Sequence, residues 1–262
     1  MLPTYWSSAR YHLPHTIVPA FHVNIILFYP EEVELLLSCR DFRARHILDM
    51  LRRQPGDTFD AGLINGPRGR GTLVAIGVEA LTLSFVWAEP PPPLSPLHLL
   101  IGLPRPQTAR DILREATSLG VATLHFVRTD RGEASYASSA LWKAEEWRAQ
   151  VIQGAAQAFC TRLPEVTHGR TLTEALAALP AGTTRLAIDN YEAAAPLATC
   201  LLPVGGSPAV LALGAERGWS AAERELLRHH GFTLVHLGAR VLRTETACVA
   251  AVTLLKARLG WL

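Results

Sequence analysis

The stretch Leu237-Gly238-Ala239-Arg240-Val241-Leu242-Arg243-Thr244-Glu245-Thr246-Ala247 guides the interpretation of this 262-residue chain. It follows an apolar run from Thr233 to Leu237, which is typical of a strand, and leads into a segment rich in alanine, which is typical of a helix. Loops between a strand's carboxyl end and the next helix hold ligands in open α/β sheets. Two arginines and a glutamate in this loop therefore predict a binding site, and the alternative is a solvated surface turn.

Composition predicts a globular chain of one large domain or two smaller ones. Hydrophobic residues make up 49 % of the sequence, and no segment reaches the ~18 apolar residues of a membrane helix. Residues 1–23 contain three prolines and three histidines. They lack the charged and apolar regions of a secretory signal, so we expect a loosely ordered extension.

The four cysteines and the N-terminal histidines predict neither disulfides nor a metal site. The cysteines are far apart in sequence and form no Cys-x-x-Cys pair, which indicates reduced thiols in a cytoplasmic protein. The histidines of the extension, His12, His15 and His22, have no neighbouring cysteine and no helix to fix their geometry. His229 and His230 close an expected helix, where the negative end of the helix dipole favours a cation, so a capping role is expected for them.

The basic residues are nearly all arginines, and they concentrate in one segment. Net charge is only +2, and Lys143 and Lys256 are the only lysines. Arginine suits forked contacts to phosphate, although a high-GC genome produces the same bias. Residues 40–70 carry a local excess of positive charge, which indicates either a nucleic-acid footprint or a solvated helix face. The candidate RNA-binding residues are Arg43, Arg45, His46, Arg52 and Arg53.

Short strands and tight turns predict a small β-barrel or sandwich in the first third of the chain. We expect helices at 31–37 and 41–53. The expected strands are 24–28, 58–64, 71–76 and 81–87. Four consecutive prolines, Pro90 to Pro93, favour a stiff extended connector. We therefore divide the chain into the extension 1–23, a barrel domain 24–93 and a second domain 94–262.

Strands and helices alternate in the second domain, which predicts a parallel sheet covered on both faces, an α/β fold. We expect strands at 97–103, 122–127, 186–189, 209–213 and 233–237. The expected helices are 109–119, 139–159, 172–179, 220–230 and from 244 onward.

A second glycine-containing corner, Leu213 to Ser220, resembles the first in position. Gly214 and Gly218 allow a tight turn, and Ser220 with Glu223 predicts a capping box for the next helix. The sequence lacks the glycine-rich motifs of nucleotide triphosphate and dinucleotide sites. Gly205-Gly206-Ser207-Pro208 does not match the nucleophile elbow of α/β-hydrolases.

Together, these corners resemble those of the SPOUT class of RNA methyltransferases, and within it the family that methylates N3 of a uridine in small-subunit (16S) ribosomal RNA. The family's second corner stands complete at Leu237 to Ala247. Its first corner, Leu-Gly-Pro-Glu-Gly-Gly, departs here through Ala215 and Arg217. The segment His46 to Arg52 resembles its N-terminal motif, and Leu119-Gly120-Val121 resembles the end of one of its helices. The resemblance covers residues 24–262.

The resemblance implies a PUA-like β-barrel that helps to hold RNA, then a SPOUT domain with a trefoil knot. It also implies a homodimer, with no metal and no membrane, that binds S-adenosylmethionine largely through backbone groups. The implied cofactor residues are Leu213, Gly214, Glu216, Gly218, Leu237, Gly238 and Leu242.

The implied chemistry is removal of the uracil N3 proton and in-line attack on the cofactor's methyl group. A guanidinium can stabilise the negative charge that develops on uracil oxygens. Arg243 is the first candidate and Arg240 the second, while Glu245 would orient an arginine or act as the base. Because the first corner is altered, and because Gln157 to Arg162 lacks the acid and glycine of relatives, two alternatives stay open. These are a non-catalytic RNA-binding or ribosome-assembly protein, and a methyltransferase of another RNA.

Overall fold

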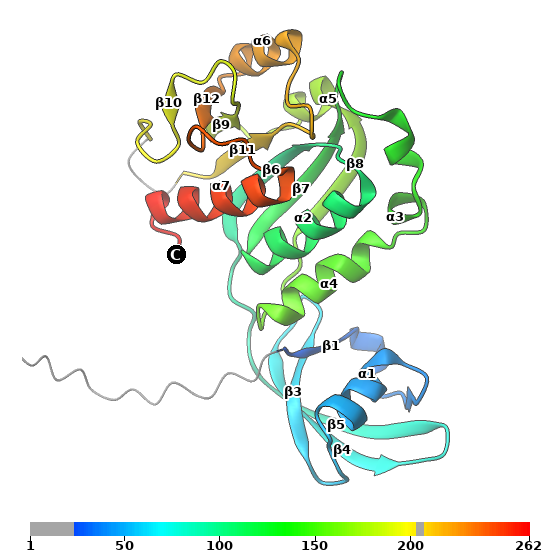
Figure 1. The fold of residues 1–262 in the computed structure, drawn as a ribbon. Coiled ribbons are helices and arrows are strands. Elements are labelled where there is room, and N and C mark those ends of the chain that lie inside the picture. Colours follow the sequence, from blue (N-terminus) through cyan, green and yellow to red (C-terminus); the bar gives the residue numbers. More distant parts are fainter. Residues whose placement is uncertain (1–23, 203–206) are drawn as a thin grey trace, which may run out of the picture.

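The computed structural model describes residues 24–202 and 207–262, which form two sheets with their helices (Figure 1). The expected extension, with its histidines, lies outside the described residues, as do Gly205 and Gly206. The first sheet has five strands in the order β1-β3-β4-β5-β2, and the second has seven in the order β10-β12-β9-β11-β6-β7-β8. The four prolines stand between the last strand of the first sheet and the first strand of the second.

The first sheet curls around an apolar core that includes Phe28, Phe59, Leu73 and Leu81. Strand β1 pairs with β3 in parallel, and the remaining pairs are antiparallel. This arrangement agrees with the small barrel expected for the first third of the chain. The strands are β1 (Ile26–Phe28), β2 (Leu37–Ser38), β3 (Thr58–Leu63), β4 (Arg68–Ile76) and β5 (Ala80–Glu89).

The helices expected in the first third are shorter than predicted. Only one 3-10 turn, η1 (Pro30–Glu32), forms near the first, because Leu37 pairs with Leu81 as part of β2. The second begins with α1 (Phe42–Arg45), whose N-cap Asp41 accepts a hydrogen bond from the Arg43 backbone. It continues as a π turn, η2 (His46–Met50).

All neighbouring strands of the second sheet are parallel, as the alternating pattern predicts. Two of them, β8 and β10, were not expected, because their sequences are polar or very short. The strands are β6 (Ser95–Gly102), β7 (Val121–Arg128), β8 (Glu165–Thr171), β9 (Thr184–Ile188), β10 (Ala195–Pro196), β11 (Ala209–Leu213) and β12 (Thr233–His236).

Helices cover both faces of this sheet (Figure 1). The core on one face joins Leu99 and Leu211 to α2 (Pro106–Ser118), α4 (Trp147–Gln157) and α7 (Thr244–Leu259). The core on the other joins Leu100 and Val210 to α5 (Leu172–Ala177) and α6 (Ala221–His229). Neighbouring residues of a strand point to opposite faces, which explains why β6 and β11 are almost wholly apolar.

The single long helix expected at 139–159 is wrong, because the chain forms two separate helices there. A 3-10 turn, η3 (Ala134–Ser138), precedes α3 (Ala140–Lys143), and α4 begins only at Trp147. Between α3 and α4, Glu145 has a left-handed backbone with φ of 55°. The break lets α3 turn Leu141 and Trp142 into the core.

The first sheet packs against the segment that joins α4 to β8. The Asn65 N–H donates to the Thr161 carbonyl at 2.7 Å, and the Leu163 N–H donates to the Asn65 side chain at 2.9 Å. Directly before β1, the Ile25 N–H donates to the Ala156 carbonyl at 3.2 Å. These bonds hold β1 beside α4 and shape the groove between them.

Candidate active site

The loops that follow five parallel strands gather at one edge of the second sheet. Because carboxyl ends of parallel strands meet at the same edge, this is where open α/β sheets bind ligands. The strands β6, β7, β9, β11 and β12 end there. Their loops are 103–105, 129–133, 189–191, 214–218 and 237–243.

The corner after β11 is a tight turn that needs both of its glycines. A Cβ on Gly214 would lie 2.8 Å from the Gly218 Cα, which is too close for any side chain, and Gly218 has a φ of 63°. The Gly218 N–H closes the turn by donating to the Ala215 carbonyl at 2.8 Å. Ser220 then caps α6 in a capping box with Glu223, which confirms the sequence prediction.

Three hollows surround Glu216, which lines all of them. The inner hollow, of about 190 Å³, lies between the 214–218 corner and the 241–247 segment. The outer hollow, of about 460 Å³, is lined by Arg105, Thr108, Glu216 and residues 241–245. The side hollow, of about 290 Å³, is lined by Arg105, Glu216 and Arg217 with residues 131–133 and 136. The Glu216 carboxylate accepts the Arg105 backbone N–H at 2.9 Å, so it ties the β11 corner to the start of α2.

Most of the predicted cofactor residues line the inner hollow, namely Leu213, Gly214, Glu216, Gly218 and Leu242. Leu237 and Gly238 are not among its lining residues. Leu237 packs against the core of the second sheet. Gly238 has a φ of 111°, and its N–H donates to the His236 ring at 3.0 Å, so it shapes the loop.

The candidate catalytic residues separate into two groups. Arg243 and Glu245 line the outer hollow next to Arg105. Arg240 is exposed and lines none of the three hollows. The geometry therefore favours Arg243 over Arg240 as the arginine that faces a substrate.

The sequence interpretation missed the loop after β9. Asp189 is buried and accepts the backbone N–H groups of Tyr191 at 2.8 Å and Glu192 at 2.6 Å. It also accepts the Arg224 Nε at 2.7 Å. Burial raises the pKa of its carboxyl, but the bonds from Arg224 and the backbone outweigh burial and hold the pKa below its ordinary value. An aspartate directly after a buried strand was the available signal.

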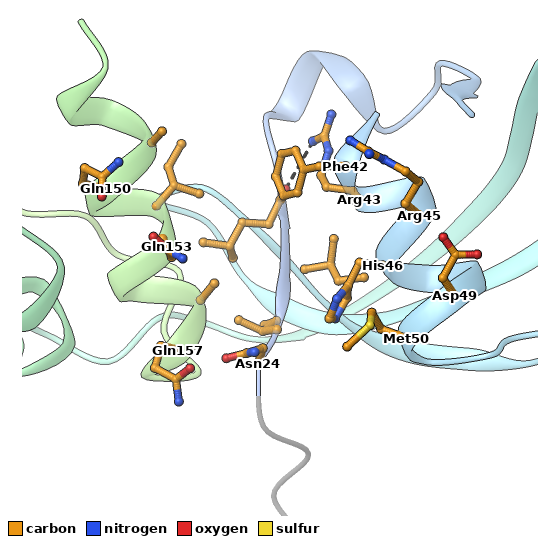
Figure 2. A pocket seen from close by; sticks show the side chains of 16 residues that line it. Asn24, Phe42, Arg43, Arg45, His46, Asp49, Met50, Gln150, Gln153 and Gln157 are labelled. Atoms are coloured by element: carbon orange, nitrogen blue, oxygen red, sulfur yellow. Dashed lines mark hydrogen bonds between the residues drawn. The ribbon is translucent and has the colours of Figure 1, made fainter. Parts of the chain in front are cut away.

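A separate, larger groove of about 730 Å³ lies between α4 and the first sheet (Figure 2). Arg45 and His46 line it from α1 and the π turn, together with Phe42 and Met50, which are 67 % and 73 % exposed. Three glutamines approach it from α4 (Figure 2). They are Gln150, Gln153 and Gln157. Neither the glutamines nor Phe42 was predicted as a binding residue.

The other candidate RNA-binding residues lie differently. Arg43 reaches the groove, but its guanidinium donates to Glu32 at 2.7 Å and to Asp41 at 2.8 Å, and lies 4.9 Å from the Phe28 ring centre. Its guanidinium is therefore engaged in contacts that stabilise the fold. Arg52, whose φ is 52°, and Arg53 are not among the residues that line the groove.

The fold is that of an RNA methyltransferase. The family model described as an RNA methyltransferase domain matches residues 90–256. The chain belongs to this family, and within it to the family of the ribosomal RNA small subunit methyltransferases E.

Relatives span nearly the whole chain. Ribosomal RNA small subunit methyltransferase E of Treponema pallidum is 38 % identical, over 87 % of this chain and 89 % of its own length. A Neisseria gonorrhoeae protein of the same name, bound to S-adenosyl methionine, aligns with a TM-score of 0.68 at 25 % identity, over 89 % of this chain and 98 % of its own. A Legionella pneumophila methyltransferase structure aligns at 0.74 and 22 % identity, over 90 % and 98 %, and supports the fold.

Among residues 24–202 and 207–262 there is neither a membrane-spanning helix nor a cluster of metal ligands. Helices there are too short or too polar to cross a membrane. In the same residues, no three His, Cys, Asp or Glu side chains gather as metal ligands. The four cysteines all lie in this part of the chain and are unpaired.

The buried ion pair between Asp189 and Arg224 holds the loop after β9 in the wall of the inner hollow. We expect this pair to contribute strongly to the free energy of unfolding. The two side chains are 1 % and 6 % exposed. Removing one partner of a buried pair costs about 3–5 kcal/mol because the other charge stays buried. Arg224 keeps a second partner in Glu192 at 3.1 Å, so Asp189→Asn should lower the free energy of unfolding by about 3 kcal/mol, the lower end of this range, in urea titrations.

The matched control is Glu225→Gln, which removes an acid that pairs with Arg228 on the surface of the same helix and is 73 % exposed. Its effect should stay below about 1 kcal/mol. Equal effects of the two variants would contradict the role given to Asp189.

Proposed function

We propose that this protein transfers a methyl group from S-adenosylmethionine to N3 of a uridine in small-subunit ribosomal RNA. The observation that carries the proposal is the shared edge at which the inner hollow, with the predicted cofactor corner, adjoins the outer hollow, with Arg243 and Glu245. The family relationship and the Neisseria gonorrhoeae structure bound to S-adenosyl methionine support it.

The residues of the inner hollow fit S-adenosylmethionine. Its walls include the apolar side chains of Ile188, Leu213 and Leu242, which suit an adenine ring. Gly214 and Gly218 add no side chain to its wall, so a ligand can approach the backbone of the corner closely. When bound, the cofactor supplies an electrophilic methyl group that needs no activation by the protein.

The outer hollow contains an arginine and a glutamate, Arg243 and Glu245, which suit the deprotonation of a uracil. Deprotonation of N3 places negative charge on the adjacent carbonyl oxygens, and a preorganised guanidinium stabilises such charge. We assign this role to Arg243, and we assign Glu245 to orient the arginine or to accept the proton. Positioning of the base beside the methyl group contributes ~7–11 kcal/mol in favourable cases.

We assign RNA holding to residues 24–93, and methyl transfer to residues 94–262. The groove of Figure 2 offers Arg45 for a phosphate, Phe42 and His46 for stacking, and amides from α4 for base edges. Stacking on aromatic side chains is typical of proteins that bind single-stranded RNA. We also propose a knotted, homodimeric methyltransferase domain, on the resemblance of the two corners alone.

Cofactor binding tests the inner hollow. Leu242→Ala removes an apolar wall, so the Kd for S-adenosylmethionine in calorimetry should rise about tenfold or more. Leu201→Ala is the matched control, because Leu201 is 97 % exposed and does not line the hollow. If the native chain does not bind the cofactor, the protein is a non-catalytic RNA-binding scaffold instead.

Methyl transfer tests the outer hollow and the substrate. Small subunits from a strain that lacks the gene should gain 3-methyluridine on treatment with the native enzyme, as mass spectrometry of nucleosides measures. Arg243→Ala should lower kcat roughly 100-fold, as loss of an oxyanion donor does. Arg240→Ala should change it less than about threefold, because Arg240 lines none of the three hollows at the sheet edge. Unchanged 3-methyluridine in the deletion strain would contradict the assigned substrate and favour another RNA.

RNA affinity tests the groove. Phe42→Ala should weaken binding of ribosomal RNA by about 1–3 kcal/mol, since it removes a stacking surface. Leu35→Ala is the control, because Leu35 is 64 % exposed but lines no part of the groove. Equal RNA affinity of the two variants would remove the groove from the RNA-binding surface.

A further inference from the structure

Arg217 replaces a glycine of the family's first corner, and its position links two hollows. It is exposed and lines both the inner hollow and the side hollow. Arg105 and Arg131 complete the side hollow with it. The three arginines come from the loops after β6, β7 and β11, so distant parts of the sequence gather three guanidinium groups around about 290 Å³.

None of these three guanidinium groups forms an ion pair within the described part of the chain, unlike those of Arg43 and Arg224. Arg105 donates its Nε to the Thr108 hydroxyl at 3.0 Å, and Arg131 donates one Nη to the Arg217 carbonyl at 3.1 Å. A guanidinium has five N–H donors. Most of the donors around the side hollow therefore have no protein acceptor in this part of the chain.

The two carboxylates of the side hollow are engaged with backbone groups. Glu216 accepts the Arg105 N–H at 2.9 Å, and Glu133 accepts the Ser135 N–H at 3.4 Å. Three guanidinium groups against two carboxylates leave a net positive charge. The hollow therefore favours an anion with several acceptor oxygens.

The loop that carries Arg131 is held in place from both sides. Its neighbour Asp130 accepts the Ser220 hydroxyl at 2.6 Å, and the Asp130 N–H donates to Glu223 at 2.8 Å. The Gly132 N–H donates to the Thr129 carbonyl at 3.1 Å. Because the loop is fixed before a ligand arrives, less conformational entropy is lost on binding.

We propose that the side hollow is a phosphate subsite of the RNA substrate, and that Arg217 is one of its ligands. The proposal rests on the proposed function, because it places the phosphate beside the nucleotide whose base enters the outer hollow. Arg105 and Glu216 line both hollows, so the two subsites are contiguous. Arginine suits this role because its planar fork matches two phosphate oxygens.

The carboxylate of the cofactor is the competing anion. Arg217 lines the inner hollow as well, but Arg105 and Arg131 do not. A cofactor carboxylate in the inner hollow would therefore use one of the three arginines, whereas an RNA phosphate in the side hollow uses all of them.

The test is the salt dependence of binding of a fluorescent ten-nucleotide oligouridylate, measured by anisotropy. Arg217→Gln should weaken binding roughly tenfold at low salt, and should reduce the slope of log K against log salt by about 0.7, the value for one phosphate contact to a single strand. Arg217→Gly, which restores the family's glycine, should do the same. Arg228→Gln is the control, because Arg228 is a surface arginine paired with Glu192 and Glu225.

Calorimetry of Arg217→Gln with S-adenosylmethionine completes the test, because it measures separately whether Arg217, which also lines the inner hollow, contacts the cofactor. The phosphate subsite would be overturned if Arg217→Gln had the same salt slope as the native protein and the Arg228→Gln control. A weaker cofactor affinity with an unchanged RNA slope would assign Arg217 to the cofactor and would also overturn it. If Arg217→Gln reduces the salt slope but the native protein transfers no methyl group, the phosphate subsite is retained and the proposed function is rejected.

Discussion

The close approach of the β6 and β11 ends is the constraint on which the sheet edge depends. A Cβ on Gly102, at the end of β6, would lie 2.6 Å from the Ala215 nitrogen, so glycine alone lets the two loops meet. Glu216 can then reach the first turn of α2 and accept the Arg105 N–H, where the helix dipole favours a negative charge. Held in this way, Glu216 lines all three hollows. A bulkier residue at position 102 or 214 would move the walls of all three.

The parallel sheet and its edge could be predicted because their signals are local. Apolar strands alternated with amphipathic helices, and the glycine corners stood at the ends of two strands. Ser220 and Glu223 formed the expected capping box for the same reason, since a cap depends on residues three apart. The family resemblance then added predicted roles for both corners.

What the sequence could not show depends on contacts between distant segments. The break at Glu145 follows from the burial of Leu141 and Trp142, which no helical pattern reveals. The strand β8 is polar, with exposed residues along it, and it forms only because β7 offers a free edge. Asp189 belongs to the site because Arg224, 35 residues later, returns to pair with it. In the same way, the groove of Figure 2 joins residues of α1 to an α4 face more than 100 residues away.

The groups that an arginine contacts distinguish a structural arginine from a candidate RNA ligand. Its position in the sequence distinguishes them less well. Arg43 belongs to the basic segment that predicts an RNA footprint, yet two carboxylates and the Phe28 ring occupy its guanidinium. Arg217 belongs to a corner expected to bind the cofactor, yet its side chain joins two others that have no carboxylate partner among the described residues. A net charge of +2 is therefore compatible with a polyanionic substrate. Carboxylates neutralise structural arginines such as Arg43 and Arg224, whereas the three arginines of the side hollow have no carboxylate partner among the described residues and can serve the proposed phosphate subsite.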